Sequence, residues 1–252
     1  MLVAERHEKI IALVNERGSI RVTELSQHFQ VTEETIRRDL ERLEKEGKLR
    51  RSHGGAVSIK TNQVEAPYFE REIRNVKEKT EVAKAALTYV EEHDRIILDA
   101  STTAWYMAKL LPNIALTVVT NSLKVAMELA QHDKVTVISL GGMLLPRSLS
   151  FVGPMATDFL EQYHVNKAFL SCQGIHHERG ISDSNELQAI VKRKMIEISD
   201  QTYLLADYSK FGIQAFARIG SLESVQIIIT DHSTTDKQLA EFHDLPLTIV
   251  KS

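Results

Sequence analysis

The apolar residues change their spacing partway along the chain, from that of helices to that of short strands. Ile36, Leu40 and Leu43 recur at i, i+4 and i+7, so they share one face of a helix and predict that this face is buried. Thr32 stands before the helix as a predicted N-cap, and Gly47 is expected to end it. The pattern therefore predicts a capped, amphipathic helix between these two residues.

Shorter patterned segments lie on both sides of this helix. In chain order the sequence predicts a helix that closes at Arg17-Gly18, a short strand at 19–22, a helix at 23–29 capped by Thr23, the helix between Thr32 and Gly47, and a hairpin of strands at 48–52 and 56–59. This order is the winged variant of the helix-turn-helix, in which the second helix of the pair enters the major groove of DNA.

Two arginines of this helix fall off its apolar stripe. Arg37 and Arg38 therefore face outward, where guanidinium groups can pair with guanine. Asp39 is able to hold either arginine in an ion pair, so the sequence leaves open which one reads a base. Glu33 and Glu34 either complement the helix dipole or accept a hydrogen bond from cytosine. The competing interpretation is a small helical interaction module with solvated charges, and the arginines of the hairpin argue against it.

Beyond residue 76 the apolar residues gather into short runs rich in β-branched side chains. Such runs occupy residues 95–100, 116–120, 135–140, 167–172, 201–207, 225–230 and 247–250. Helical stretches lie between several of them, at 103–111, 122–131, 155–163, 186–199 and 235–243. Strands that alternate with helices predict an α/β domain whose mostly parallel sheet is covered on both faces.

The residues after these strands are small and polar. They include Asp99 with Ser101–Thr103, Thr120–Ser122, Gly141-Gly142, residues 182–186 and residues 207–210. Parallel sheets bind ligands at the carboxyl ends of their strands, and hydroxyls at a helix N-terminus suit an anion. Taken singly, these residues are typical N-caps and turns. Together they predict a site for a small phosphorylated or polyhydroxylated ligand.

Residues 58–76 carry no clear apolar period and are interpreted as a linker, with a helix that begins near Pro67 or Tyr68. The predicted organisation is a DNA-binding domain at 1–57, the linker, and an effector and oligomerisation domain at 77–252.

Composition and charge refine this interpretation. The net charge of −3 argues against a nucleic-acid binder as a whole, but residues 37–51 hold seven basic and four acidic residues. Cys172 is the only cysteine, which excludes an intramolecular disulfide, and its apolar neighbours indicate a buried strand end. No long apolar run or signal peptide is found, so we expect a cytoplasmic protein without a membrane partner. No residue cluster predicts a metal site or a cofactor.

The string TIRRDLERLEKEGKLRRSHGGA, with the residues before it, resembles the N-terminal domain of the DeoR family of bacterial transcription regulators. The resemblance extends over essentially the full length. It implies that Thr35, Arg37 and Arg38 face DNA and that Arg50, Arg51 and His53 lie on or next to the wing. The complete set of DNA-binding candidates is Thr23, Thr32, Glu34, Thr35, Arg37, Arg38, Arg50, Arg51 and His53.

The segments LDASTTAWYMAKLL, VVTNSLKVA, LGGMLL, SDSNELQAIVKRKMIE and LLADYSKFG resemble the effector domain of the same family, whose fold is similar to ribose-5-phosphate isomerase and CoA transferases. The resemblance implies a sugar-phosphate effector. It implies that Ser101–Thr103 hold the phosphate, that Lys210 supplies a cation, and that Asp183, Asn185 and Glu186 bind sugar hydroxyls. The complete set of effector candidates is Asp99, Ser101, Thr102, Thr103, Thr120, Asn121, Ser122, Gly141, Gly142, Asp183, Asn185, Glu186 and Lys210.

We therefore expect a repressor of a sugar-catabolic operon that a phosphorylated sugar releases from a double-stranded operator. Paired half-sites favour a homodimer or homotetramer. Within the family the chain looks most like regulators of rhamnose operons, which makes rhamnulose 1-phosphate the candidate effector. The alternatives are an activator with the same parts, or a sugar-phosphate enzyme with a DNA-binding arm. The enzyme is disfavoured because residues 171–174 and 191–194 lack the carboxylates that the isomerases use.

Overall fold

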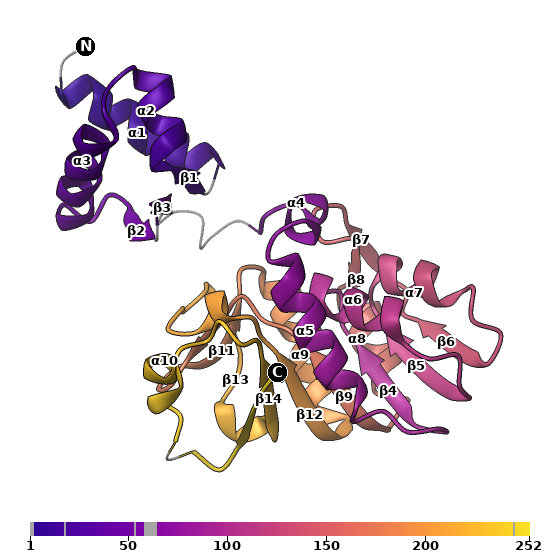
Figure 1. Cartoon of the computed structure of the whole chain (residues 1–252). Coiled ribbons are helices and arrows are strands. Elements are labelled where there is room, and N and C mark those ends of the chain that lie inside the picture. The colour runs from indigo at the N-terminus through magenta and orange to yellow at the C-terminus, as the bar shows by residue number, and fades with distance from the viewer. Residues whose placement is uncertain (1–2, 18, 53, 58–64, 244) are drawn as a thin grey trace. The chain divides into compact units, whose positions relative to one another are not determined.

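The computed structural model describes residues 3–17, 19–52, 54–57, 65–243 and 245–252. The chain divides into two compact units, Met1–Ala66 and Pro67–Ser252 (Figure 1). Within the described ranges, no helix combines the length and the apolar character needed to cross a membrane.

The first unit is a winged helix-turn-helix, as the sequence predicted. Its elements are α1 (Val3–Arg17), β1 (Ser19–Arg21), α2 (Val22–Phe29), α3 (Glu33–Lys45), β2 (Arg50–Ser52) and β3 (Gly55–Val57). The strands form an antiparallel sheet in the order β1-β3-β2. Ile36, Leu40 and Leu43 of α3 are buried against Leu25 and the apolar face of α1. A Cβ atom at Gly55 would lie 2.3 Å from the backbone oxygen of Ile20, so the sheet requires glycine there.

The ends of the helices agree with the predicted caps in one case and differ in another. Thr32 caps α3, and its hydroxyl accepts a hydrogen bond from the backbone N–H of Thr35 at 3.3 Å. The prediction that Thr23 caps α2 is wrong, because the helix begins one residue earlier and Arg21 occupies the N-cap position. Thr23 is instead an exposed residue of the first turn.

Asp39 does not pair with the arginines next to it in the sequence. Its carboxylate turns inward and binds Arg6 of α1 through two contacts, Nε–Oδ2 at 2.6 Å and Nη2–Oδ1 at 3.1 Å. His7 Nε2 lies 3.0 Å from the same carboxylate. Burial alone would raise the pKa of Asp39, but these hydrogen bonds outweigh it and hold the pKa below its usual value. This ion pair joins α3 to α1.

The second unit contains the predicted parallel sheet. Its seven strands lie in the order β15-β14-β12-β9-β4-β5-β6, and every neighbouring pair is parallel. All seven predicted apolar runs form these strands: β4 (Arg95–Leu98), β5 (Leu116–Thr120), β6 (Val135–Ser139), β9 (Val165–Leu170), β12 (Ser199–Leu205), β14 (Ile227–Thr230) and β15 (Thr248–Lys251).

Helices cover both faces of this sheet (Figure 1). One face packs against α5 (Val76–Leu87), α6 (Thr102–Leu110) and α7 (Leu123–Leu129), with Ile96 and Leu98 of β4 pointing into this core. The other face packs against α8 (Pro154–Leu160) and α9 (Glu186–Glu197), and there Ile97 points into the core. The alternation along β4 explains why a strand buried on both faces is almost wholly apolar.

The structure adds elements that the sequence did not predict. A hairpin of β7 (Met143–Leu145) and β8 (Ser150–Val152) forms its own two-stranded sheet. A second small sheet joins β10 (Gly174–His176), β11 (Gly180–Asp183) and β13 (Ala217–Gly220). The short helices η2 (Tyr208–Lys210) and η3 (Leu222–Ser224) were also not predicted, whereas α4 (Tyr68–Glu72) and α10 (Asp236–Ala240) lie where helices were expected. Helix α4 begins at Tyr68 as expected, and residues 67–76, which we assigned to the linker, belong to the second unit.

We expect Asp39→Ala to destabilise the first unit by about 3–5 kcal/mol, because it leaves the buried guanidinium of Arg6 without a counter-charge. Hydrogen exchange of the α3 amides in the full chain measures this loss. Glu41→Ala is the control, since it removes only an exposed pair with Lys45 and should cost less than about 1 kcal/mol. Equal protection of α3 in both variants would contradict the prediction.

Candidate functional site

The outward face of α3 presents the two arginines that the sequence singled out. Arg37 Nη2 lies 2.7 Å from Glu33, and Arg38 Nε lies 3.3 Å from Glu34, in each case one turn earlier on the helix. All four side chains are at least 42% exposed. Exposed pairs of this kind contribute about 0–1 kcal/mol, so a phosphate or a base edge can replace the glutamate.

The start of α3 holds the two threonine candidates together. The hydroxyls of Thr32 and Thr35 are 2.9 Å apart, while Thr32 also caps the helix. Arg50 and Arg51 are exposed on β2, and the backbone N–H of Arg51 donates to Glu44 of α3 at 2.7 Å. This bond ties the wing to the helix that it flanks. His53 lies outside the described residues.

In the second unit, the candidates after the central strands meet in one buried polar network. Asp99 follows β4 and is fully buried. Its carboxylate accepts hydrogen bonds from the backbone N–H groups of Ser101 at 3.1 Å and Ser171 at 3.0 Å. Asp99 therefore joins the loop after β4 to the loop after the neighbouring strand β9.

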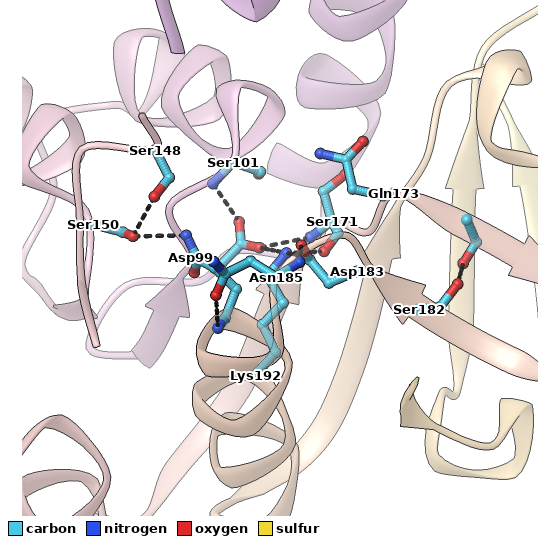
Figure 2. Close-up of polar contacts among 12 residues, drawn as sticks. Asp99, Ser101, Ser148, Ser150, Ser171, Gln173, Ser182, Asp183, Asn185 and Lys192 are labelled. Atoms are coloured by element: carbon cyan, nitrogen blue, oxygen red, sulfur yellow. Dashed lines mark hydrogen bonds and ion pairs between the residues drawn. The ribbon is translucent and has the colours of Figure 1, made fainter. Parts of the chain in front are cut away.

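The centre of this network is a lysine that the sequence analysis did not select. Lys192 reaches from α9 to the carboxylates (Figure 2), with Nζ 2.8 Å from Asp183 Oδ2 and 3.2 Å from Asp99 Oδ2. Its ammonium also donates to the backbone oxygen of Ser171 at 2.7 Å. Burial opposes the charge of Lys192, but the two carboxylates outweigh that effect and raise its pKa. Burial likewise opposes ionisation of Asp183, and Lys192 holds the pKa of that carboxyl below its usual value.

Side chains cap the N-termini of three helices around this network. Ser101 accepts from the N–H of Ala104 in α6 at 3.0 Å, Ser122 from Val125 in α7 at 3.2 Å, and Asn185 from Gln188 in α9 at 3.2 Å. A capping hydroxyl uses one lone pair and keeps its O–H as a donor. Thr102, Thr103 and Thr120 are buried beside these caps. The capping role is therefore real and leaves donors for a ligand.

Other candidates lie at the margin of the network. Lys210 is half-buried in η2, with Nζ 3.5 Å from Gln173 Oε1. Gly141 and Gly142 are exposed, and a Cβ at Gly142 would lie 2.7 Å from the backbone oxygen of Val152, so the glycine there has a structural reason. Glu186 is exposed in the first turn of α9, and no described hydrogen bond joins it to the network.

A second group of polar residues extends the network to β8. Ser148 and Ser150 are 2.8 Å apart, and Gln188 Nε2 lies 2.6 Å from Ser150 Oγ (Figure 2). All three residues are buried, and the sequence analysis selected none of them. Gln188, Lys192 and Met195 stand at i, i+4 and i+7 on the buried face of α9. Polar residues on an apolar stripe were the signal that could have found the first two.

Cys172 follows β9 and is buried, as expected. Burial raises the pKa of its thiol to about 12, which keeps it protonated and unreactive at neutral pH.

These features define a class of protein, a DNA-binding regulator with an α/β sensor domain. The sequence profile of a DeoR-like helix-turn-helix domain matches residues 6–62, and that of the DeoR C terminal sensor domain matches residues 74–232. The chain therefore belongs to the DeoR family of transcription regulators.

Known proteins are similar over most of the chain. It is 62% identical to a Bacillus subtilis (strain 168) protein named uncharacterized HTH-type transcriptional regulator YulB, over 92% of this chain and 90% of that one. It is 40% identical to the L-fucose operon activator of Haemophilus influenzae, over 95% and 97%. Among solved structures, ribose 5-phosphate isomerase A from Methanocaldococcus jannaschii matches 54% of each chain, with a TM-score of 0.41 and 17% identity.

We expect Lys192→Met to cost about 3–5 kcal/mol at neutral pH, because it leaves two buried carboxylates without their cation. It should also reverse the pH dependence. In the unaltered chain the pKa of Asp183 is lowered, so its stabilising contribution is present above 3.8 and is lost as the pH falls. In the variant burial acts without the lysine and raises that pKa, so stability should decrease as the pH rises.

Urea unfolding of the second unit between pH 3 and 8 measures both effects. Lys194→Met on the same helix is the control, because Lys194 forms its pairs with Glu161 and Glu197, which are at least half exposed. If the free energy of unfolding of Lys192→Met changed with pH in the same direction as that of the unaltered chain, the lysine would not be what lowers the pKa of Asp183.

Proposed function

We propose that the chain represses a sugar-catabolic operon and that a phosphorylated sugar releases it from its operator. The observation that carries this proposal is the buried network around Lys192 at the carboxyl edge of a parallel sheet, whose carboxylates accept hydrogen bonds from the loops that start α6 and α9. Such an edge is where α/β domains bind small anionic ligands. The function belongs to the cytoplasm, where operator DNA and sugar phosphates are both present.

The proposed operator contacts come from α3 and the wing. Arg37 and Arg38 can exchange their glutamate partners for guanine or phosphate. The hydroxyl of Thr35 would face the same groove of the DNA. In the wing, Arg50, Arg51 and His53 would bind the phosphates of the DNA backbone beside that groove. Three further residues complete the set. Thr23 and Thr32, in the first turn of α2 and at the N-cap of α3, would contact phosphates. Glu34 would release Arg38 when DNA binds. One unit makes few phosphate contacts, so a homodimer or homotetramer on paired half-sites is part of the proposal.

The proposed effector site is built around the first capped helix. Ser101, Thr102 and Thr103 offer hydroxyls and backbone N–H groups to the phosphate, and Lys210 offers a cation. Thr120, Asn121, Ser122, Gly141 and Gly142 would line the site. Asp99 and Asp183 take part through Lys192, while Asn185 and the exposed Glu186 would contact hydroxyls at the rim.

Release follows from linkage between the two units. The sugar phosphate binds one arrangement of the oligomer more tightly, and the operator binds another, so the ligand shifts the equilibrium only by that difference in affinity. Rhamnulose 1-phosphate is the proposed effector on the resemblance to rhamnose regulators. An activator with the same effector logic is the second candidate, and the 40% identity to an operon activator favours it.

Operator release tests this proposal directly. The purified chain is bound to its own upstream DNA at fixed salt and titrated with rhamnulose 1-phosphate, other sugar phosphates and the unphosphorylated sugars. We expect release by one sugar phosphate and by none of the free sugars. Tighter binding would instead favour the activator, and intact DNA binding without any response would contradict the effector site.

Two variants separate the two functions. Arg38→Ala should weaken operator binding by about 10- to 100-fold, since a base-reading arginine contributes about 1–3 kcal/mol, and should leave effector binding unchanged. Thr102→Asp should retain operator binding and weaken effector binding by about tenfold or more, because it places a carboxylate beside the phosphate.

The matched controls are Arg42→Ala, on the last turn of α3, and Thr157→Asp, in the first turn of α8. Gel shift and calorimetry measure the two affinities. If Arg38→Ala has no more effect on operator affinity than Arg42→Ala, the proposed placement of α3 in the groove is wrong.

A further inference from the structure

Three polar side-chain atoms near the starts of α7 and α9 are buried without a hydrogen-bond partner among the described residues. They are Asn121 Oδ1, Ser184 Oγ and Gln188 Oε1, and their residues are at most 9% exposed. They come from the loop after β5, the loop between β11 and α9, and the first turns of α9. Buried polar groups are nearly always paired, so three in one region require an explanation.

Strand β8 sets the orientation of the Asn121 amide and contacts the amide of Gln188. Asn121 Nδ2 donates to the backbone oxygen of Phe151 at 3.1 Å, and Gln188 Nε2 lies 2.6 Å from Ser150 Oγ. A carbonyl oxygen only accepts, so the nitrogen of Asn121 must face Phe151 and its own oxygen must point away. Ser148, 2.8 Å from Ser150, braces the hydroxyl that Gln188 contacts.

The chemistry of the unpaired atoms selects their partner. Two of them are amide oxygens, which accept hydrogen bonds and do not donate. They would repel a phosphate, whose oxygens are also acceptors at neutral pH, and they suit the O–H groups of a sugar or polyol. The third, the hydroxyl of Ser184, can accept or donate.

We propose that Asn121, Ser184 and Gln188 form the hydroxyl-recognition end of the effector site. This inference rests on the proposed function and adds the orientation of the ligand, with its phosphate toward Ser101–Thr103 and its distal hydroxyls toward β8. A site that pairs with a ligand hydroxyl discriminates strongly against analogues that lack it, because its own polar groups are then left unpaired. Gln188 is thus a specificity-determining residue.

The β7–β8 hairpin is firmly joined to the body beside these atoms. Ser150 forms a bridge to Ser122, and backbone hydrogen bonds link the hairpin to Tyr68, Leu123 and Asn121. The side chains of Asn121 and Gln188 add two further bonds. This end of the effector site is therefore preorganised by the fold.

The test measures the affinity of the full chain for rhamnulose 1-phosphate, fuculose 1-phosphate and glycerol 3-phosphate by calorimetry. We expect Gln188→Met, which keeps the length of the side chain and removes its amide, to lower the affinity for the preferred ketose phosphate by about 10- to 100-fold. The affinity for glycerol 3-phosphate, which lacks the distal hydroxyls of a ketose phosphate, and the affinity for operator DNA should stay within about twofold. Ser184→Ala is the second variant, with a loss of about threefold to tenfold expected.

The control is Gln162→Met, the same change at an exposed position after α8. An unchanged ketose phosphate affinity in Gln188→Met and Ser184→Ala would overturn the inference and indicate that the unpaired atoms hold structural water only. Equal losses for the ketose phosphate and glycerol 3-phosphate would also overturn it, since they indicate a general distortion. If the unaltered chain binds none of the three compounds, the proposed function fails for these ligands and the subsite fails with it.

Discussion

The ammonium of Lys192 is the contact on which the second unit is organised. It joins Asp99 after β4, Asp183 at the end of β11 and the backbone of Ser171 after β9, and it does so from within α9. Each of these groups alone would be costly to bury, because a desolvated charge needs a partner. Together they fix the loops that start α6 and α9. The capped starts of α6 and α9 therefore depend on this one cation.

A buried ion pair also holds the first unit together. Arg6 and Asp39 form a buried, two-contact pair that joins α1 to α3, while Arg37 and Arg38 remain on the exposed face with partners that are easily exchanged. Buried charges thus hold each framework, whereas exposed charges keep partners that can be exchanged. Arg38 and Asp39 are neighbours in the sequence, yet Asp39 forms a buried pair and Arg38 an exposed one.

The sequence predicted elements whose signal is local. All seven strands of the large sheet were found because each coincides with a short apolar run, and α3 was found because its apolar residues repeat at helical spacing. The β7–β8 hairpin was missed because β7 is only three residues long and two of these, Met143 and Leu144, are exposed. Thr23 was misplaced because the observed N-cap, Arg21, lies two residues earlier, and a local pattern does not fix a helix end that closely.

The site was only partly predictable, because its central contacts join residues far apart in the chain. Lys192 stands in the string Val191-Lys192-Arg193-Lys194, which has the composition of a solvated surface, and only the folded chain brings it to Asp99. This lysine also bears on what the site can do. A general base needs a pKa near the working pH, and Lys192 holds the pKa of Asp183 below the usual range of a carboxyl group. Both carboxylates are held in ion pairs with the lysine, so neither is available as a proton acceptor. The network therefore suits binding of a ligand and not proton transfer.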